Sequence, residues 1–134
     1  MMLVAVSDTP EDLYYVSTHE WVLMDADGVA TVGITDFAQS ELGDIVYVQL
    51  PEEGIQVSAR DEVSVVESVK TAADIYAPVS GEIIQVNARL DDSPEIINEL
   101  PYDDGWIMKI RVSDEAELEE LLSAEDYKDS IDEE

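Results

Sequence analysis

Residues 65–81 read VVESVKTAADIYAPVSG, and this stretch decides how the chain folds. Valine-rich sequence precedes Lys70, and Ile75 to Ala77 follows it. Because β-branched and aromatic residues favour strands, we expect a strand on each side of a bend at Lys70-Thr71-Ala72. The stretch therefore predicts a hairpin that presents one lysine at its tip, held by rigid elements and exposed to other proteins.

Two stretches of the chain resemble each other around this hairpin. Residues 43–48 read GDIVYV and residues 81–86 read GEIIQV, and each is followed by a second aliphatic segment, at 63–69 and at 106–112. This repeat predicts two similar halves. If the halves pair around a local two-fold axis, the bend at Lys70 lies at one end of a small β-sandwich.

The remaining elements are short. Asp27-Gly28 between two apolar runs predicts a hairpin of residues 20–24 and 29–34. Turn and capping residues predict the other elements, which are a helical turn at Thr9 to Asp12, a helix at 37–42 capped by Thr35 or Asp36 and ended by Gly43, a turn at 51–54, and C-terminal helices beginning at Ser113 and Ser123. We expect one mainly β domain over residues 1–134, with its core at about 14–112, a helical segment at 113–128 and a solvated acidic tail at 129–134.

Negative charge dominates the composition. The chain has 33 Asp and Glu residues against 6 Lys and Arg, for a net charge of -27. Nucleic acid and anionic membranes are therefore not expected as partners, because binding to phosphate needs clustered cations. A salt-rich cytoplasm would screen the self-repulsion of such a chain, and a docking surface for basic partners is the alternative.

Most kinds of reactive site are absent from the sequence. The chain has no Cys, and His19 is its one histidine, so thiolate chemistry and a His-rich metal site are excluded. His19 itself is expected to be a surface or interface residue, and no glycine-rich phosphate loop is present. The N-terminal sequence resembles neither a secretory signal nor a membrane span, which predicts a soluble, cytoplasmic protein.

Lys70 is the residue best placed for a covalent modification. The chain has two other lysines, Lys109 on the polar face of an expected strand and Lys128 in the acidic tail. A lysine at a hairpin tip is accessible to an enzyme that acylates it, and acylation would change the net charge from -27 to -28. An ordinary solubilising lysine is the alternative that the pattern alone leaves open.

Four motifs in order along the chain carry a family resemblance. They are STHEWV, GVATVGITDFAQSELGDIVYVQLP, VVESVKTAADIYAPVSGEIIQVN and PYDDGWIMKI, and together they resemble the glycine cleavage system H proteins from about Tyr14 to Tyr127. The resemblance implies a barrel-sandwich hybrid of two quasi-equivalent antiparallel halves, of the lipoyl/biotinyl type, with a C-terminal helix. Biotinyl domains differ because they place Met beside the modified lysine, where this chain has Val69 and Thr71.

The resemblance also implies a function. Lys70 would carry lipoate through an amide, and Glu67 would belong to the pattern that lipoate-attaching enzymes recognise. Such a protein has no catalytic or metal-binding residues of its own. Its arm would accept an aminomethyl group from the pyridoxal-phosphate enzyme glycine decarboxylase, pass the one-carbon unit to tetrahydrofolate at an aminomethyltransferase, and be reoxidised by dihydrolipoamide dehydrogenase.

In this family a cleft holds the loaded arm and limits its hydrolysis. Its polar lining corresponds here to Thr18, Glu20 and Asp74, and Ile34 would supply an apolar wall. A carboxylate such as Glu20 could hold the ammonium end of the arm by a charge-assisted hydrogen bond. Thr71 departs from the usual Ala of the family, Ala73 from Ser or Thr, and residues 58–62 from a Lys-Gly turn.

The leading hypothesis is thus a non-enzymatic, monomeric lipoyl carrier for glycine cleavage, from a halophile. A relay that hands lipoate to other lipoate-dependent complexes is the main alternative. A plain interaction domain whose lysine is never modified is a third.

Overall fold

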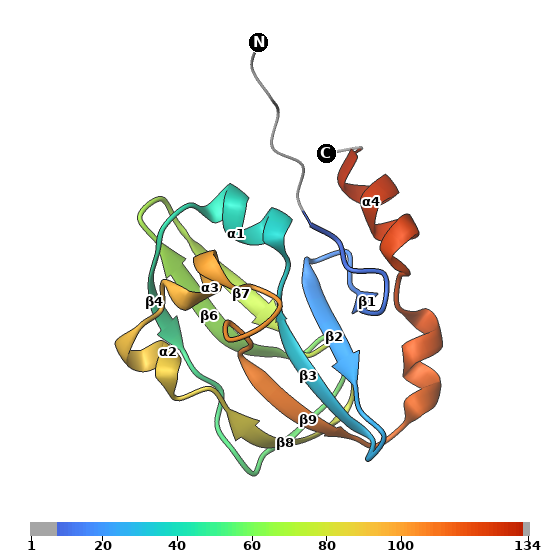
Figure 1. Cartoon of the computed structure of the whole chain (residues 1–134). Coiled ribbons are helices and arrows are strands. Elements are labelled where there is room, and N and C mark those ends of the chain that lie inside the picture. Colours follow the sequence, from blue (N-terminus) through green and yellow to red (C-terminus); the bar gives the residue numbers. More distant parts are fainter. Residues whose placement is uncertain (1–7, 133–134) are drawn as a thin grey trace.

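The computed structural model describes residues 8–132 and is mainly β (Figure 1). Its strands are β1 (Tyr14–Tyr15), β2 (Glu20–Met24), β3 (Val29–Ile34), β4 (Ile45–Gln49), β5 (Gln56–Val57), β6 (Glu62–Ser68), β7 (Ala72–Tyr76), β8 (Gly81–Val86) and β9 (Met108–Val112). Its helices are α1 (Asp36–Leu42), α2 (Arg89–Asp92), α3 (Ile96–Glu99), the 3-10 helix η1 (Glu115–Glu120) and α4 (Ala124–Asp132).

Two antiparallel sheets form a barrel-sandwich. One sheet has six strands in the order β1-β2-β3-β9-β8-β5, and the other has three in the order β4-β6-β7. Figure 1 shows the small sheet, in green, lying against β3 and β9 of the large sheet, with α1 across one end. The predicted hairpins β2-β3 and β6-β7 are both confirmed.

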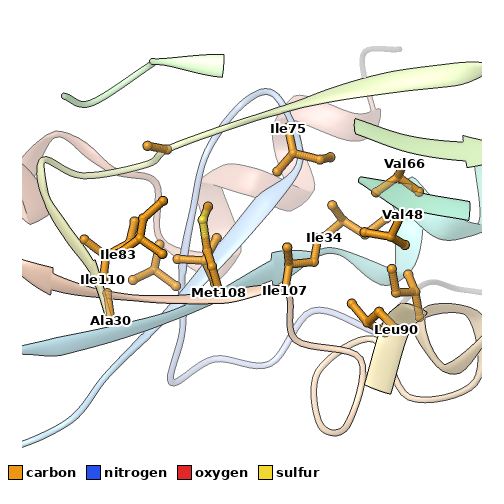
Figure 2. Packing of buried hydrophobic residues seen from close by; sticks show 14 of the residues in the cluster. Ala30, Ile34, Val48, Val66, Ile75, Ile83, Leu90, Ile107, Met108 and Ile110 are labelled. Carbon is orange, nitrogen blue, oxygen red and sulfur yellow. The ribbon is translucent and has the colours of Figure 1, made fainter. Parts of the chain in front are cut away.

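The core lies between the two sheets. Figure 2 shows Val66 and Ile75 of the small sheet together with Ile34 and Met108 of the large one, all of them almost completely buried. Burying such aliphatic side chains stabilises the fold by about 1.5–3 kcal/mol each. Because every second residue of a strand points inward, β6 and β7 both contribute side chains to this core, and this packing holds the two strands of the hairpin in place.

The predicted repeat is confirmed by a shared irregularity. GDIVYV begins β4, which pairs with β6, and GEIIQV forms β8, which pairs with β9. The register shifts between Ile45 and Tyr47 in the first pair and between Ile83 and Gln85 in the second, which is the same place in the repeat. The opening glycine of the second copy is obligatory, because a Cβ on Gly81 would lie 2.0 Å from the main-chain oxygen of Arg111.

The helices differ from prediction in several places. Residues 11–12 form a turn and no helix. The C-terminal segment begins as a 3-10 helix capped by Asp114 rather than Ser113, and α4 continues to Asp132, past the predicted end at 128. Residues 133–134 of the predicted tail lie outside the described part. No pattern in the sequence predicted α2 and α3.

Two helix ends define the neighbourhood of the predicted site. The side chain of Thr35 accepts the Ala38 N–H and caps α1, and Gly43 ends this helix at a φ of 80°. Asn98 of α3 then fixes that end, because its Nδ2 donates to the main-chain oxygen of Gly43 and its Oδ1 accepts the N–H of Ile45. The unpredicted α3 therefore anchors the segment that faces the Lys70 hairpin.

Candidate functional site

The hairpin tip between β6 and β7 is a well-ordered turn of Ser68 to Thr71. The N–H of Ser68 donates to the Thr71 oxygen at 2.7 Å, and its Oγ accepts the N–H groups of Lys70 and Thr71 at 3.1 Å each. The N–H of Val69 donates to Asp44 at 3.0 Å. These contacts hold the tip rigidly while the side chain of Lys70 stays exposed.

The side chain of Lys70 folds toward the end of α1. Its Nζ donates to the main-chain oxygen of Glu41 at 3.0 Å. Its Cε would lie 3.6 Å from a Cβ placed on Gly43, which is an ordinary van der Waals distance, so the lysine stem passes close to the end of α1. The amine is thus accessible to an acylating enzyme and is directed along α1.

A small cleft of about 180 Å³ lies beside this contact. Its walls come from the segment before β2, the end of β3, α1 and β7, and they are Thr18, His19, Ile34, Phe37, Ala38, Glu41, Leu42, Ala73, Asp74 and Ile75. Glu41 belongs both to the cleft and to the hydrogen bond with Lys70. The interior is mostly apolar, and its polar groups are few, which is the usual character of a small ligand site.

Three of the four predicted cleft residues line this cleft. Thr18 and Asp74 are exposed polar residues of its wall, and Ile34 is a buried apolar one. Asp74 also lies next to Glu62, whose pKa is raised by the charge of Asp74 and by a hydrogen bond to it. The wall is therefore negative at this side, which favours a cationic group in the cleft.

Glu20 does not line the cleft, so the predicted direct contact with a ligand does not match its position. It is completely buried, its Oε1 accepts a hydrogen bond from the hydroxyl of Thr18, and its Oε2 accepts one from the N–H of Tyr76 at 3.1 Å. Desolvation raises the pKa of Glu20 to about 7, although both hydrogen bonds lower it. Glu20 therefore lies behind the wall of the cleft and orients the hydroxyl of Thr18 through this hydrogen bond.

Glu67 lies outside the cleft. It is exposed on β6, three residues before Lys70, and pairs across the strands with Tyr47 and Ala72. This placement leaves its carboxylate accessible on the hairpin that presents Lys70. Its proposed recognition by an attaching enzyme stays a prediction.

Several wall residues were not predicted from the sequence, and His19 is the most informative of them. It was expected to be a surface or interface residue, but it is half-buried, has a φ of 79°, and its ring lies 5.1 Å from that of Phe37. The apolar face of the helix at 37–42 was a signal for Phe37 and Leu42. No local signal identified His19, because its neighbours come from distant segments.

A larger hollow of about 370 Å³ lies on the other side of Thr18. It is lined by Tyr15, Tyr76, Leu121 and others, with Arg60 at its wall, but it contains neither Lys70 nor any residue of α1. We therefore place the site at the smaller cleft, because its wall includes Glu41, whose main-chain oxygen accepts a hydrogen bond from Lys70. Within residues 8–132 no cluster of three potential metal ligands occurs, and none of the helices there is long and apolar enough to cross a membrane.

The residues present fit an acyl chain on Lys70. The amine is exposed, and the cleft beside it offers an apolar interior with Ile34, Phe37 and Leu42 for an aliphatic arm. Thr18 and Asp74 supply polar groups at the wall for whatever the arm carries. An aliphatic chain with a polar or cationic end therefore matches these residues.

Comparisons with known proteins agree with this site. The glycine cleavage H-protein family profile matches residues 13–134. A glycine cleavage system H protein of Marinobacter nauticus is 53% identical over 126 residues, covering 94% of this chain and 97% of its own. One from Alteromonas mediterranea is 56% identical over 129 residues, covering 96% of this chain and 100% of its own.

A solved structure extends the agreement to three dimensions. The crystal structure of a glycine cleavage system H protein from Mycobacterium marinum superposes with a TM-score of 0.85 at 40% identity, covering 92% of this chain and 98% of that one. Similarity of this extent, in sequence and in fold, covers the hairpin, the cleft and the C-terminal helix together. The chain therefore belongs to the glycine cleavage H-protein family.

Proposed function

We propose that this chain is the lipoyl-carrying component of the glycine cleavage system and has no catalytic activity of its own. The main support for the proposal is the position of Lys70. Its amine extends from a hydrogen-bonded hairpin tip beside a small, mostly apolar cleft. A chain attached there can reach a partner enzyme and return to the cleft. The names of the curated relatives support the same conclusion.

Each site residue has a distinct part in this proposal. Lipoate, joined to Lys70 as an amide, supplies a disulfide that can accept a one-carbon unit and two electrons. Ile34 forms the apolar wall, and Thr18 and Asp74 provide polar contacts at the wall. Glu20 holds the Thr18 hydroxyl in place from behind. Because the cleft excludes bulk water on its apolar side, it slows loss of a bound group to hydrolysis.

The partners follow from this role. We propose that glycine decarboxylase, an aminomethyltransferase and dihydrolipoamide dehydrogenase visit the arm in turn, and that a lipoate-attaching enzyme recognises Glu67 beside Lys70. Tethering raises the local concentration of the arm at each active site. We also propose a monomer in a salt-rich cytoplasm, and the net charge of -27 supports the monomeric state and the high salt. A dimer mass by light scattering, or recovery in an envelope fraction, would contradict it.

Intact mass of the chain from its native host tests the attachment. We expect a mass increase of one lipoyl group, absent in Lys70→Arg and retained in Lys109→Arg, which preserves charge in the same way at another lysine. An unmodified chain in every molecule would defeat the proposal. The role in glycine cleavage is tested separately by mixing the lipoylated chain with glycine decarboxylase, unlabelled glycine and labelled bicarbonate, and following exchange of the label. Transfer of label into glycine is expected, and its absence would favour the lipoate relay.

A further inference from the structure

A tyrosine of the C-terminal helix reaches both walls of the cleft. The hydroxyl of Tyr127, on α4, lies 2.7 Å from Nδ1 of His19 and 2.7 Å from Oγ1 of Thr35. His19 belongs to one wall of the cleft. Thr35 caps α1, which forms another wall of the cleft, by accepting the Ala38 N–H at 3.1 Å. One hydroxyl thus bridges the two walls, although Tyr127 is 108 residues away from His19.

The burial of Thr35 indicates which hydroxyl group donates in the hydrogen bond between Thr35 and Tyr127. Thr35 is completely buried, and its oxygen already accepts from Ala38, so its own hydrogen needs an acceptor. Tyr127 is an acceptor within reach, and its hydroxyl also lies within hydrogen-bond distance of Nδ1 of His19.

The position of the hydroxyl is itself fixed by packing. Tyr127 is completely buried, and its ring stacks on that of Tyr15 with centroids 4.8 Å apart and planes 11° from parallel. Trp21 and Ala124 belong to the same apolar cluster between α4 and β2. The tyrosine therefore has no room to turn its hydroxyl away from the cleft walls.

We propose that Tyr127 is a positioning residue of the cleft, which sets the ring of His19 and the first turn of α1 at a fixed separation. The proposal rests on the proposed function in so far as the cleft receives the arm. In this proposal α4 does more than cover the sheet, because the hydroxyl of Tyr127 sets the width of the cleft.

The test compares two tyrosine-to-phenylalanine variants of the same stacked pair. Tyr127→Phe removes the bridging hydroxyl, and Tyr15→Phe removes a hydroxyl that donates instead to the main-chain oxygen of Pro10 at 2.6 Å. Both remove one hydroxyl from a completely buried ring, so a merely structural effect appears in both melting temperatures alike. The readouts are the imidazole nitrogen resonances of His19 and amide exchange at Ala38, both in the unmodified chain.

The expected result is specific to Tyr127. The imidazole nitrogen resonances of His19 are the same in the unaltered chain and in Tyr15→Phe, whereas they shift in Tyr127→Phe. Exchange at the Ala38 amide rises about fivefold in Tyr127→Phe, the factor to which a net hydrogen bond of about 1 kcal/mol converts. Formaldehyde released into water after loading with glycine decarboxylase and glycine is also expected to appear about fivefold faster.

Two results would overturn the proposal: unshifted imidazole resonances of His19 in Tyr127→Phe, or equal behaviour of the two variants in these resonances and in exchange. Should Tyr127→Phe not fold, Thr35→Val removes the same bridge from its other end, and an unchanged His19 spectrum there is equally decisive. Because the first two readouts need no lipoate, a chain that is never lipoylated defeats the proposed function and leaves this test intact.

Discussion

The amine of Lys70 donates a hydrogen bond to the main-chain oxygen of Glu41, 3.0 Å away, at the C-terminal end of α1. Cations are stabilised at that end of a helix, since the last carbonyl groups carry partial negative charge. The unmodified lysine is therefore held against the body of the protein. An enzyme that acylates it must detach the amine from Glu41 and cover the hairpin tip while doing so.

The first prediction concerns the surface that such an enzyme would cover. Val46, Tyr47 and Val69 lie near the tip and are 56%, 50% and 67% exposed. The register shift in β4 brings Val46 and Tyr47 to the surface together. We expect Tyr47→Ser to lower kcat/KM for enzymatic lipoylation about tenfold, because aromatic residues dominate such contacts. Mass spectrometry of timed reactions measures this rate.

The matched control is Leu100→Ser, which removes another exposed apolar side chain, 42% exposed, from a different part of the surface. It should be lipoylated at the normal rate. Equal lipoylation rates for the two variants would show that the attaching enzyme does not recognise the apolar tip.

The second prediction concerns pH. Burial raises the pKa of Glu20 to about 7, above its unfolded value of 4.5, so the folded state binds more protons between these values. Stability therefore falls as pH rises through this window, and the loss is complete above pH 7. The free energy of unfolding of Glu20→Gln, measured relative to that of the unaltered chain, should therefore increase by on the order of 3 kcal/mol between pH 4.5 and pH 8.

Urea unfolding at each pH measures this difference. Glu99→Gln removes an equal charge from an exposed site and so corrects for general repulsion. If the difference between Glu20→Gln and Glu99→Gln is constant from pH 4.5 to 8, the buried carboxyl does not titrate in this range.

The third prediction concerns Arg60, which has a φ of 79°. Such a left-handed conformation costs roughly 1 kcal/mol in a residue with a Cβ and little in glycine. Arg60→Gly should therefore raise the melting temperature by about 3 °C. Arg60→Ala loses the same charge but keeps the strain, so it should melt below Arg60→Gly. Calorimetry that placed the alanine variant level with or above the glycine variant would contradict this account.

The fourth prediction concerns salt. A net charge of -27 on a compact chain produces strong self-repulsion, which is screened over roughly 3 Å at 1 M salt and over about 30 Å at 0.01 M. The melting temperature should rise steadily from 0.01 M to 1 M potassium chloride. Equal melting temperatures at the two ends of the series, or a lower one at high salt, would refute a fold adapted to salt.

Much of the fold could be predicted because its signals are local. The β6-β7 hairpin, the β2-β3 hairpin and the capped α1 each follow from a few adjacent residues, whose propensities and turn chemistry do not depend on distant parts. The helices α2 and α3 were missed because each has only four residues, too few for a hydrophobic period.

The candidate site was predictable only in part. Lys70 was identified by its flanking strands, whereas Glu20 was one acid among 33 and showed no sign of being buried. Glu20, Trp21 and Val22 are all buried in succession, so the usual alternation is lost in β2. The cause is that α4 covers one face of this strand and the core covers the other.

The amino-acid sequence by itself determined the hairpin, its lysine and the repeated half, since each depends on neighbouring residues along the chain. Only the tertiary structure decided that Glu20 lies behind the cleft and that Tyr127 contacts His19 and Thr35. The physical reason is that burial and side-chain contact arise from the packing of segments far apart in sequence. Local propensity does not specify which distant segments will meet.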